Sequence, residues 1–207
     1  MKGIKNIILD LGGVLINLDF KKANLELGNL GLKNSFTKSK QIELFDRLEE
    51  GRISDIEFLK EFNVFASTNW SNESIINAWN SILLDFPADR LELVKKLNKN
   101  YRMFLFSNTN SIHIKEVYAK LKKAHGVENL DDYFEKVYLS NDLGIRKPKP
   151  EGFIHIVNSN KLNPSETLFI DDSPQHIVGA KQAGIRAEWL DLEKEDIHEM
   201  LTRLSLI

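Results

Sequence analysis

The sequence predicts an α/β fold, in which a doubly wound parallel sheet carries a small inserted helical domain. Short apolar runs such as Ile7-Ile8-Leu9, Met103–Phe106 and Leu168–Ile170 each stop at a polar residue, which is typical of strands buried on both faces. Helical patterns alternate with these runs in the second half of the chain, which favours parallel strands joined by right-handed crossovers. Residues 20–86 carry helical periodicity instead of strand-like runs.

The main domain is expected over residues 1–19 and 87–207. Residues 4–9 form its first strand, and Gly12-Gly13 lets the backbone turn tightly close to a ligand. Pro87 marks the return to this domain. The remaining elements are expected in the following order: helix 88–98, strand 101–106, helix 112–123, strand 137–139, helix 152–160, strand 167–170, a helix from Ser173-Pro174 to Gly184, strand 186–190 and helix 193–204.

The insert over residues 20–86 is expected to be a small helical bundle. Apolar residues recur at helical spacing within residues 42–49, 56–62 and 75–83. Ser54 to Glu57 has the pattern of a capping box, so a helix should begin there. The turn from Glu49 to Ile53 separates two of the helices.

Composition limits the function classes. The 207 residues are 42% apolar and 28% charged with a formal net charge of -2, which argues against nucleic acid or an anionic membrane as partner. The chain contains no cysteine, which excludes disulfides, thiol catalysis and cysteine-bound zinc. No run approaches the roughly 18 apolar residues of a membrane helix. Asp10 and Asp19 interrupt the apolar N-terminal stretch and no cleavage site follows, so we expect a cytoplasmic protein.

Chemically capable residues follow three of the predicted strands. Asp10 follows the first, Ser107-Asn108 the second and Asp171-Asp172 a third, while Lys147 lies in a loop before Pro148. Ligands of open α/β sheets bind beyond the carboxyl ends of the strands. Carboxylates suit Mg²⁺, and a hydroxyl, helix N–H groups and a lysine suit phosphate. Alone, each residue would equally suit a turn, a helix cap or the surface; together they indicate phosphate chemistry.

The motifs Asp10-x-Gly-Gly-Val-Leu, Ser107-Asn108, Lys147-Pro148 and Asp171-Asp172 resemble those of the haloacid dehalogenase (HAD) superfamily, in this order along the whole chain. The chain is most similar to the branch of sugar-phosphate phosphatases typified by α-D-glucose-1-phosphate phosphatase. This resemblance implies a Rossmann-like core with residues 20–86 as helical cap domain. It implies a phosphatase that uses Mg²⁺ and an aspartyl-phosphate intermediate. The substrate that it implies is a small phosphorylated metabolite, with a sugar phosphate as the first candidate.

The resemblance also implies roles for individual residues. Asp10 would be the nucleophile and a metal ligand, and Gly12 would offer its backbone carbonyl to the metal. Asp171 and Asp172 would complete the metal site. Ser107, Asn108 and Lys147 would hold the phosphoryl group, and we count Lys147 with Asp10 among the catalytic residues. Cap residues would choose the substrate, with the turn Glu50 to Ile53 as candidate, and the protein is expected to be a monomer or weak homodimer.

One position departs from the pattern of most phosphatases in the superfamily. They carry a second aspartate two residues after the nucleophile, as general acid and base, and this chain has Gly12 there. Such a group contributes about 10²–10⁴-fold, so its loss slows an enzyme without abolishing its activity. The glucose-1-phosphate branch resembles this chain in having glycine at the same position.

Two alternatives stay open at this stage. A 2-haloacid dehalogenase also has a non-acid after its nucleophile, but it needs no metal and would gain nothing from Asp171-Asp172. A non-catalytic phosphate-binding protein on the same fold would tolerate Gly12, although Asp10, Lys147 and Asp171 argue against it. The five histidines are scattered without metal-ligand spacing and are interpreted as surface or helix residues.

Overall fold

The computed structural model describes residues 1–33, 35, 37 and 41–207. At its centre lies a five-stranded, all-parallel sheet with the strand order β3-β2-β1-β4-β5, which confirms the predicted fold class. The strands are β1 (Asn6–Leu9), β2 (Arg102–Ser107), β3 (Lys136–Leu139), β4 (Thr167–Asp171) and β5 (Arg186–Trp189).

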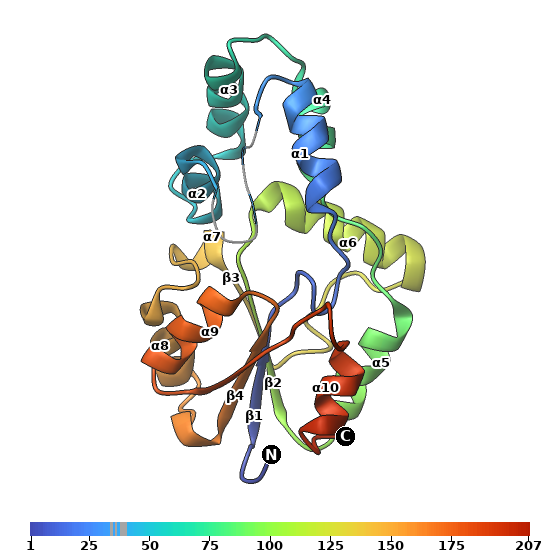
Figure 1. Cartoon of the computed structure of the whole chain (residues 1–207), viewed down its shortest axis with the longest axis vertical. Coiled ribbons are helices and arrows are strands. Elements are labelled where there is room, and N and C mark those ends of the chain that lie inside the picture. The colour runs from blue at the N-terminus through green and yellow to red at the C-terminus, as the bar shows by residue number, and fades with distance from the viewer. Residues whose placement is uncertain (34, 36, 38–40) are drawn as a thin grey trace.

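Helices cover both faces of the sheet (Figure 1). The side chains of β1 alternate between the two faces, so that Ile7 and Leu9 belong to one apolar cluster and Ile8 to the other. The first cluster takes up the apolar sides of α5 (Ala88–Leu97), α6 (Ser111–His125) and α10 (Ile197–Arg203). The second takes up α8 (Pro150–Ser159) and α9 (Pro174–Gln182).

Four helices lie beyond the carboxyl ends of the strands, at the top of Figure 1: α1 (Phe20–Asn29), α2 (Glu43–Glu49), α3 (Asp55–Ala66) and α4 (Asn72–Asn80). Aromatic rings fill the space between them, with Phe45 4.3 Å and Phe58 5.7 Å from Trp79, measured between ring centroids. The predicted capping box is present: the Ser54 hydroxyl accepts from the backbone N–H of Glu57, whose carboxylate accepts from that of Ser54. We propose that these four helices form a cap domain, and that the sheet with the helices on its two faces forms the core domain.

The elements agree with the expected order, and their ends differ by a few residues. β1 begins at Asn6 rather than residue 4, and α10 spans Ile197–Arg203 rather than 193–204, because an Asp196–Glu199 capping box starts it later. The sequence pattern does not predict two of the helices individually: α1 and the short α7 (Ser140–Leu143). The apolar stripe of α1 is narrow, since Ala23 and Leu27 are its only buried residues.

The parallel register brings the ends of three strands to one level. Leu9 pairs with Leu105 in β2 and with Ile170 in β4. Asp10, Ser107 and Asp171 therefore lie at the same edge of the sheet, under the four inserted helices. This is the arrangement that the sequence predicted for the site.

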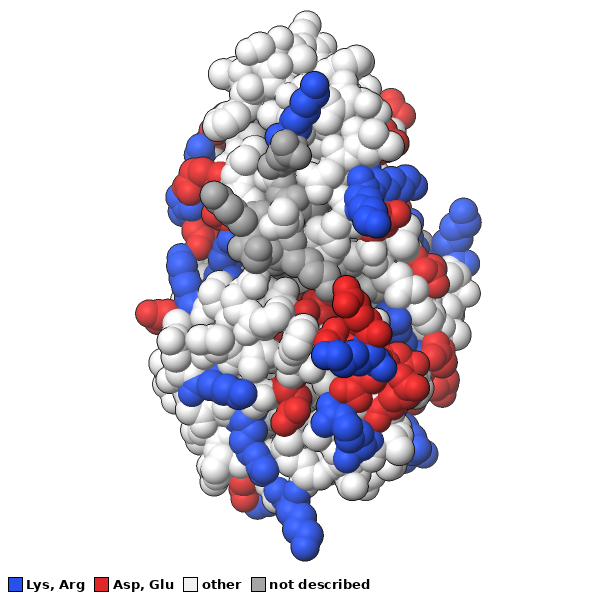
Figure 2. Space-filling view, in the orientation of Figure 1, with Lys and Arg blue, Asp and Glu red and all other residues white. Residues whose placement is uncertain are grey.

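Charged side chains of both signs occupy the surface. Figure 2 shows Lys and Arg scattered over one face and Asp and Glu gathered in its lower right part, with basic side chains among them. Within the residues that the structure describes, no helix is both long and apolar enough to cross a membrane.

Candidate active site

Three buried carboxylates meet at the carboxyl edge of the sheet. One oxygen each of Asp10, Asp171 and Asp172 lie within 4.8 Å of one another. Asp10 follows β1, Asp171 ends β4 and Asp172 precedes α9. Gly13 has a φ of +74° and lies so close that an added Cβ would be 2.4 Å from the Asp172 carboxylate, so glycine is required there. The sequence thus predicted correctly that these three aspartates lie together.

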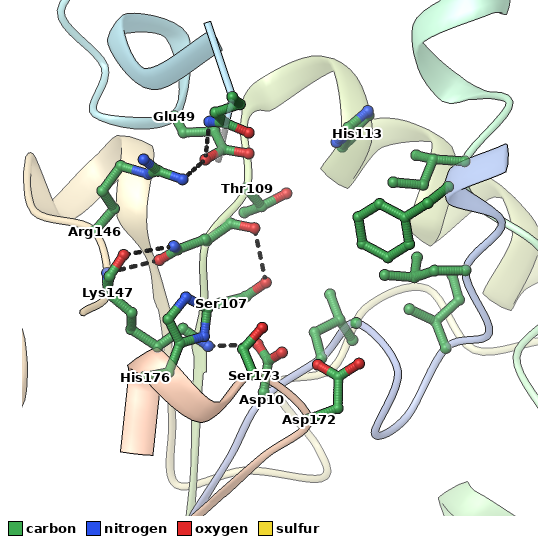
Figure 3. Close-up of a pocket in the computed structure, with 18 of the residues that line it drawn as sticks. Asp10, Glu49, Ser107, Thr109, His113, Arg146, Lys147, Asp172, Ser173 and His176 are labelled. Atoms are coloured by element: carbon green, nitrogen blue, oxygen red, sulfur yellow. Dashed lines mark hydrogen bonds and ion pairs between the residues drawn. The ribbon is translucent and has the colours of Figure 1, made fainter. Parts of the chain in front are cut away.

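Lys147 inserts its ammonium group among these carboxylates (Figure 3). Its Nζ donates to Asp10 at 2.7 Å and to Asp171 at 2.6 Å, and its side chain is fully buried. The rings of Phe106 and Phe169 lie 5.5 Å and 5.3 Å from Nζ and close the space around it. The lysine reaches the cluster from a loop more than a hundred residues away from Asp10.

Burial and mutual charge shift the ionisation of this cluster. Burial, together with the charge of Asp171, raises the pKa of Asp10 to about 8. Burial opposes ionisation of Asp171 as well, but the charges of Lys147 and His176 outweigh it and lower the pKa of Asp171 to about 2. Burial would lower the pKa of Lys147, yet the two carboxylates raise it above its usual value. One ammonium group therefore does not offset three ionised carboxylates, and Asp10 holds a proton at neutral pH unless a further cation takes its place among them.

Ser107 and Asn108 follow β2 and line the same cavity. The Asn108 side-chain amide is engaged with the backbone of Lys147: its Nδ2 donates to the Lys147 carbonyl at 2.9 Å, and its Oδ1 accepts from the Lys147 N–H at 2.8 Å. Asn108 therefore fixes the loop that carries the lysine. Ser107 lies between Lys147 and Thr109 in Figure 3.

Two of the histidines lie on helices, as expected, and both line the cavity: His113 is buried and His176 is partly exposed. His176, on α9, places Nδ1 2.9 Å from the Asp171 carboxylate. His113, on α6, stacks on the Trp79 ring at 4.6 Å between centroids. Helical periodicity alone does not show whether a histidine faces an active site or the apolar core.

The cavity has a volume of about 410 Å³ and reaches from the carboxylates to α2. Asp10 and Asp172 lie at one end in Figure 3, and Glu49 and Arg146 lie at the other. Its lining includes Asp46 and Glu49 but none of residues 50–53, all of which the structure describes. The turn Glu50 to Ile53, which the sequence suggested for substrate choice, therefore does not line the cavity. Helix α2, which ends just before this turn, does line it.

Gly12 also lines the cavity, and Leu18 stands beside it. A Cβ added at Gly12 would lie 2.8 Å from Leu18 Cδ1. The space that a side chain at position 12 would need is therefore partly taken by an apolar group. The Leu18 side chain thus gives a physical reason for glycine at position 12, because a larger residue would collide with it.

The family of the chain follows from comparison with known proteins. The model of haloacid dehalogenase-like hydrolases matches residues 4–184. The chain belongs to this family. It is 35% identical over 184 residues to D-ribitol-5-phosphate phosphatase of Bacteroides thetaiotaomicron, covering 87% of this chain and 89% of that protein.

Solved structures agree with this assignment. A mutant HAD family enzyme from Bacteroides thetaiotaomicron, in complex with magnesium and inorganic phosphate, superposes with a TM-score of 0.87 at 35% identity over 96% of this chain and 99% of that one. A HAD-like family hydrolase from Porphyromonas gingivalis gives a TM-score of 0.87 at 30% identity over 98% of both chains. The predicted family, and with it the enzyme class of a HAD-like phosphatase, a phosphoric monoester hydrolase, is confirmed. The related magnesium complexes support the expected Mg²⁺ cofactor.

His113 leads to a prediction about stability. Its Nε2 lies 3.2 Å from the Trp79 carbonyl and its Nδ1 3.2 Å from the Asn110 amide nitrogen, which fits a neutral ring protonated at Nε2. Burial lowers the pKa of His113 to about 4. Since the unfolded chain binds this proton at pH 6.5 and the folded one does not, the free energy of unfolding should fall between pH 6.5 and 4, by about 3 kcal/mol for this group.

Denaturant unfolding of the wild type and of His113→Gln at pH 7 and pH 5 measures the effect. Gln offers an N–H near the position of Nε2 and does not titrate. The variant should lose about 2 kcal/mol less than the wild type between the two pH values. Equal losses in both proteins would show that His113 accepts a proton in the folded state.

Proposed function

We propose that the protein is a magnesium-dependent phosphatase that hydrolyses a small phosphorylated sugar or polyol through an aspartyl phosphate on Asp10. The observation that carries this proposal is the contact of Asp10 with Lys147, beside Asp171 and Asp172, at the end of a cavity with room for a leaving group. The similarity to D-ribitol-5-phosphate phosphatase supports a polyol or sugar as leaving group.

The carboxylates suit a magnesium ion. Their oxygens are hard ligands within 4.8 Å of one another, and three buried carboxylates facing one ammonium group carry an excess of negative charge. Asp10, Asp171 and Asp172 would hold the ion, with the Gly12 carbonyl as a further ligand. When bound, the ion supplies positive charge that counters the charge of the phosphoryl oxygens.

The chain's own residues perform a two-step transfer. A carboxylate oxygen of Asp10 attacks phosphorus, a P–O bond forms on Asp10, and the bond to the leaving oxygen breaks. Lys147 offsets negative charge on the phosphoryl group throughout, and the Ser107 hydroxyl donates to one of its oxygens. Water then attacks phosphorus and gives a proton to a phosphoryl oxygen or to surrounding water, the bond to Asp10 breaks, and phosphate leaves.

The leaving oxygen needs a proton that position 12 does not provide. In this account the proton comes from water or from the substrate itself. The first step is therefore most sensitive to the leaving group, since a weakly basic leaving oxygen needs no proton to depart.

The acidic cluster also separates the proposal from the dehalogenase alternative. The substrate of a 2-haloacid dehalogenase is a carboxylate, which Asp171 and Asp172 would repel at this site. A phosphate ester with a bound cation relieves the same repulsion.

The metal dependence is the experiment that tests the proposed function. Phosphate release from a panel of sugar phosphates, polyol phosphates and para-nitrophenyl phosphate should stop in EDTA and return with excess Mg²⁺. Ca²⁺ should inhibit, because it adopts looser coordination with more ligands. Full phosphate release in the chelator would contradict the metal dependence, and no phosphate release from any ester with Mg²⁺ would contradict the phosphatase itself.

Gly12 leads to a prediction about leaving groups. Glucose 1-phosphate and para-nitrophenyl phosphate should be cleaved with higher kcat than glucose 6-phosphate. In the double variant Gly12→Asp with Leu18→Ala, which makes room at the 2.8 Å contact, the rate for glucose 6-phosphate should rise by up to about 10²-fold. Leu18→Ala alone is the control. If the wild type cleaves the 1- and 6-phosphates equally well and the double variant shows no gain, another group already supplies the proton.

A further inference from the structure

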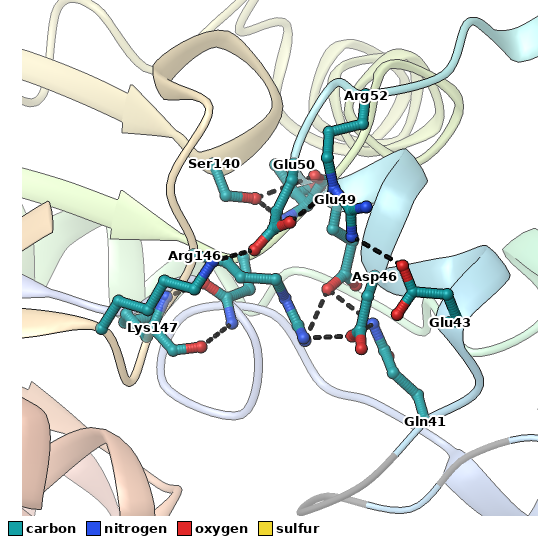
Figure 4. A network of polar contacts seen from close by, with 12 residues as sticks. Gln41, Glu43, Asp46, Glu49, Glu50, Arg52, Ser140, Arg146 and Lys147 are labelled. Carbon is teal, nitrogen blue, oxygen red and sulfur yellow. Dashed lines mark hydrogen bonds and ion pairs between the residues drawn. The ribbon is translucent and has the colours of Figure 1, made fainter.

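A polar wall lies at the end of the cavity remote from Asp10. It consists of Gln41, Asp46 and Glu49 from α2 and the segment before it, and of Arg146 from the loop that carries Lys147 (Figure 4). Arg146 pairs with Asp46 and donates from Nη2 to Glu49 at 2.8 Å. Gln41 Nε2 donates to Asp46 at 3.0 Å and to Glu49 at 2.9 Å.

This wall retains capacity for further hydrogen bonds. Arg146 Nε is buried and has no hydrogen-bond partner within the part of the chain that the structure describes. The carboxylates of Asp46 and Glu49 each have lone pairs beyond those used by Arg146 and Gln41. Glu49 is only 8% exposed, and burial raises its pKa in spite of the nearby guanidinium, so its carboxylate is poorly solvated. A ligand hydroxyl that donates to one of these carboxylates would use this capacity.

The rest of the cavity is different in character. Carbon-only side chains lie across the cavity from Arg146 in Figure 3. The apolar lining comes mostly from the two connections between the sheet and the inserted helices, and includes Leu18, Phe20, Ile82 and Leu83. A ligand that fits must therefore be polar along one edge and apolar along the other.

A polyhydroxylated carbon chain or sugar ring has this character. Each of its carbons carries a hydroxyl on one side, which both donates and accepts, and a C–H bond on the other. Nucleobases and long alkyl chains do not combine the two edges. The cavity's remaining length between Asp10 and Glu49 thus suits a leaving group with hydroxyls several bonds from phosphorus.

We propose that Glu49 and Arg146 form a hydroxyl-recognition site, which selects phosphate esters of polyols and sugars over esters of alkyl or aryl alcohols. This inference rests on the proposed function and specifies its substrate class. Burying polar groups with unused hydrogen-bond capacity is costly, so an ester without hydroxyls binds less well against the poorly solvated carboxylates of the wall. The site then discriminates against substrates that offer these carboxylates no hydrogen-bond donor.

The first test uses the wild-type protein with Mg²⁺ and two five-carbon esters, ribitol 5-phosphate and n-pentyl phosphate. Both have a primary alkyl leaving group, and only the first has hydroxyls. The kcat/KM for the polyol ester should exceed that for the alkyl ester by at least about 100-fold, because two or more charge-assisted hydrogen bonds are lost with the alkyl chain. Equal kcat/KM values would overturn the inference.

The second test uses variants in the wall. Glu49→Gln and Arg146→Met should each lower the ratio of the two kcat/KM values by roughly 10- to 100-fold, mainly through KM of the polyol ester. Arg146→Lys should restore little, since the single ammonium group of a lysine does not replace the two guanidinium nitrogens that pair with Asp46 and Glu49. The matched control is Glu50→Gln, which breaks the contacts of Glu50 with Lys149 and Arg52 beside the wall. It should leave the ratio as in the wild type.

The outcomes distinguish this inference from the proposed function. If both esters are hydrolysed with Mg²⁺ but without preference, the phosphatase assignment stands and the hydroxyl-recognition site is wrong. If the variants lower both kcat/KM values by the same factor, the wall only holds α2 against the sheet domain, and the inference is wrong again. If neither ester nor para-nitrophenyl phosphate is hydrolysed in Mg²⁺, the proposed function itself is contradicted.

Discussion

Replacement of Asp10 by asparagine is expected to abolish turnover, lowering kcat by at least about 10³-fold, because the amide oxygen is a poor nucleophile toward phosphorus. The amide has nearly the same shape as the carboxylate. It also removes one of three clustered negative charges while giving up the 2.7 Å ion pair with Lys147. These effects on stability oppose each other, so the variant should remain folded.

The measurement is kcat at saturating Mg²⁺ together with the thermal midpoint Tm. The matched control is Asp19→Asn, which makes the same chemical change at the start of α1, where the Asp19 side chain caps the helix. Since asparagine caps a helix about as well as aspartate, that variant should lose little stability and keep its turnover. An Asp10→Asn protein with half of the wild-type kcat would show that the nucleophile lies elsewhere.

Replacement of Lys147 by alanine should have the second largest effect. Its ammonium group is fully buried and contacts two carboxylates, so its removal leaves buried negative charges without a partner. Breaking such an arrangement typically costs 3–5 kcal/mol of stability, roughly, and loss of one preorganised charge-stabilising group costs about 10²–10³ in kcat. KM for phosphate esters should rise as well.

Two comparisons make this prediction specific. Lys147→Arg should restore little activity, because the planar guanidinium is bulkier than the fully buried ammonium group beside the Phe106 and Phe169 rings and cannot act as a point charge. Lys149→Ala, which removes an exposed lysine two residues away, should retain nearly full kcat. Wild-type kinetics in Lys147→Ala would mean that the buried ammonium group has no part in the reaction.

The features that the sequence could predict are those with a local signal. Apolar runs ending at Asp10, Ser107 and Asp171 predict strands, and the parallel sheet then brings their ends together without further information. Lys147 could be assigned to the same site only through its motif. Nothing in its own segment shows that the loop passes over β4.

The features that the sequence could not predict depend on contacts between distant segments. Arg146 and Glu49 are far apart in the chain, and each has the pattern of an ordinary surface charge. The engagement of Asn108 with the Lys147 backbone, and the position of Leu18 against Gly12, depend on details of loop geometry. Helical periodicity located α2, α3 and α4, but gave no sign that α2, rather than the turn after it, lines the cavity.

The central claim is that the phosphoryl group passes through a covalent bond to Asp10. The most direct test is the stereochemical course of hydrolysis, measured in water enriched in one oxygen isotope with a phosphorothioate ester whose phosphorus carries sulfur and the other two oxygen isotopes, so that the released thiophosphate is chiral. Transfer to Asp10 and then to water comprises two in-line displacements, each of which inverts phosphorus, so we predict overall retention of configuration. Overall inversion would show a single direct attack by water and would contradict the account.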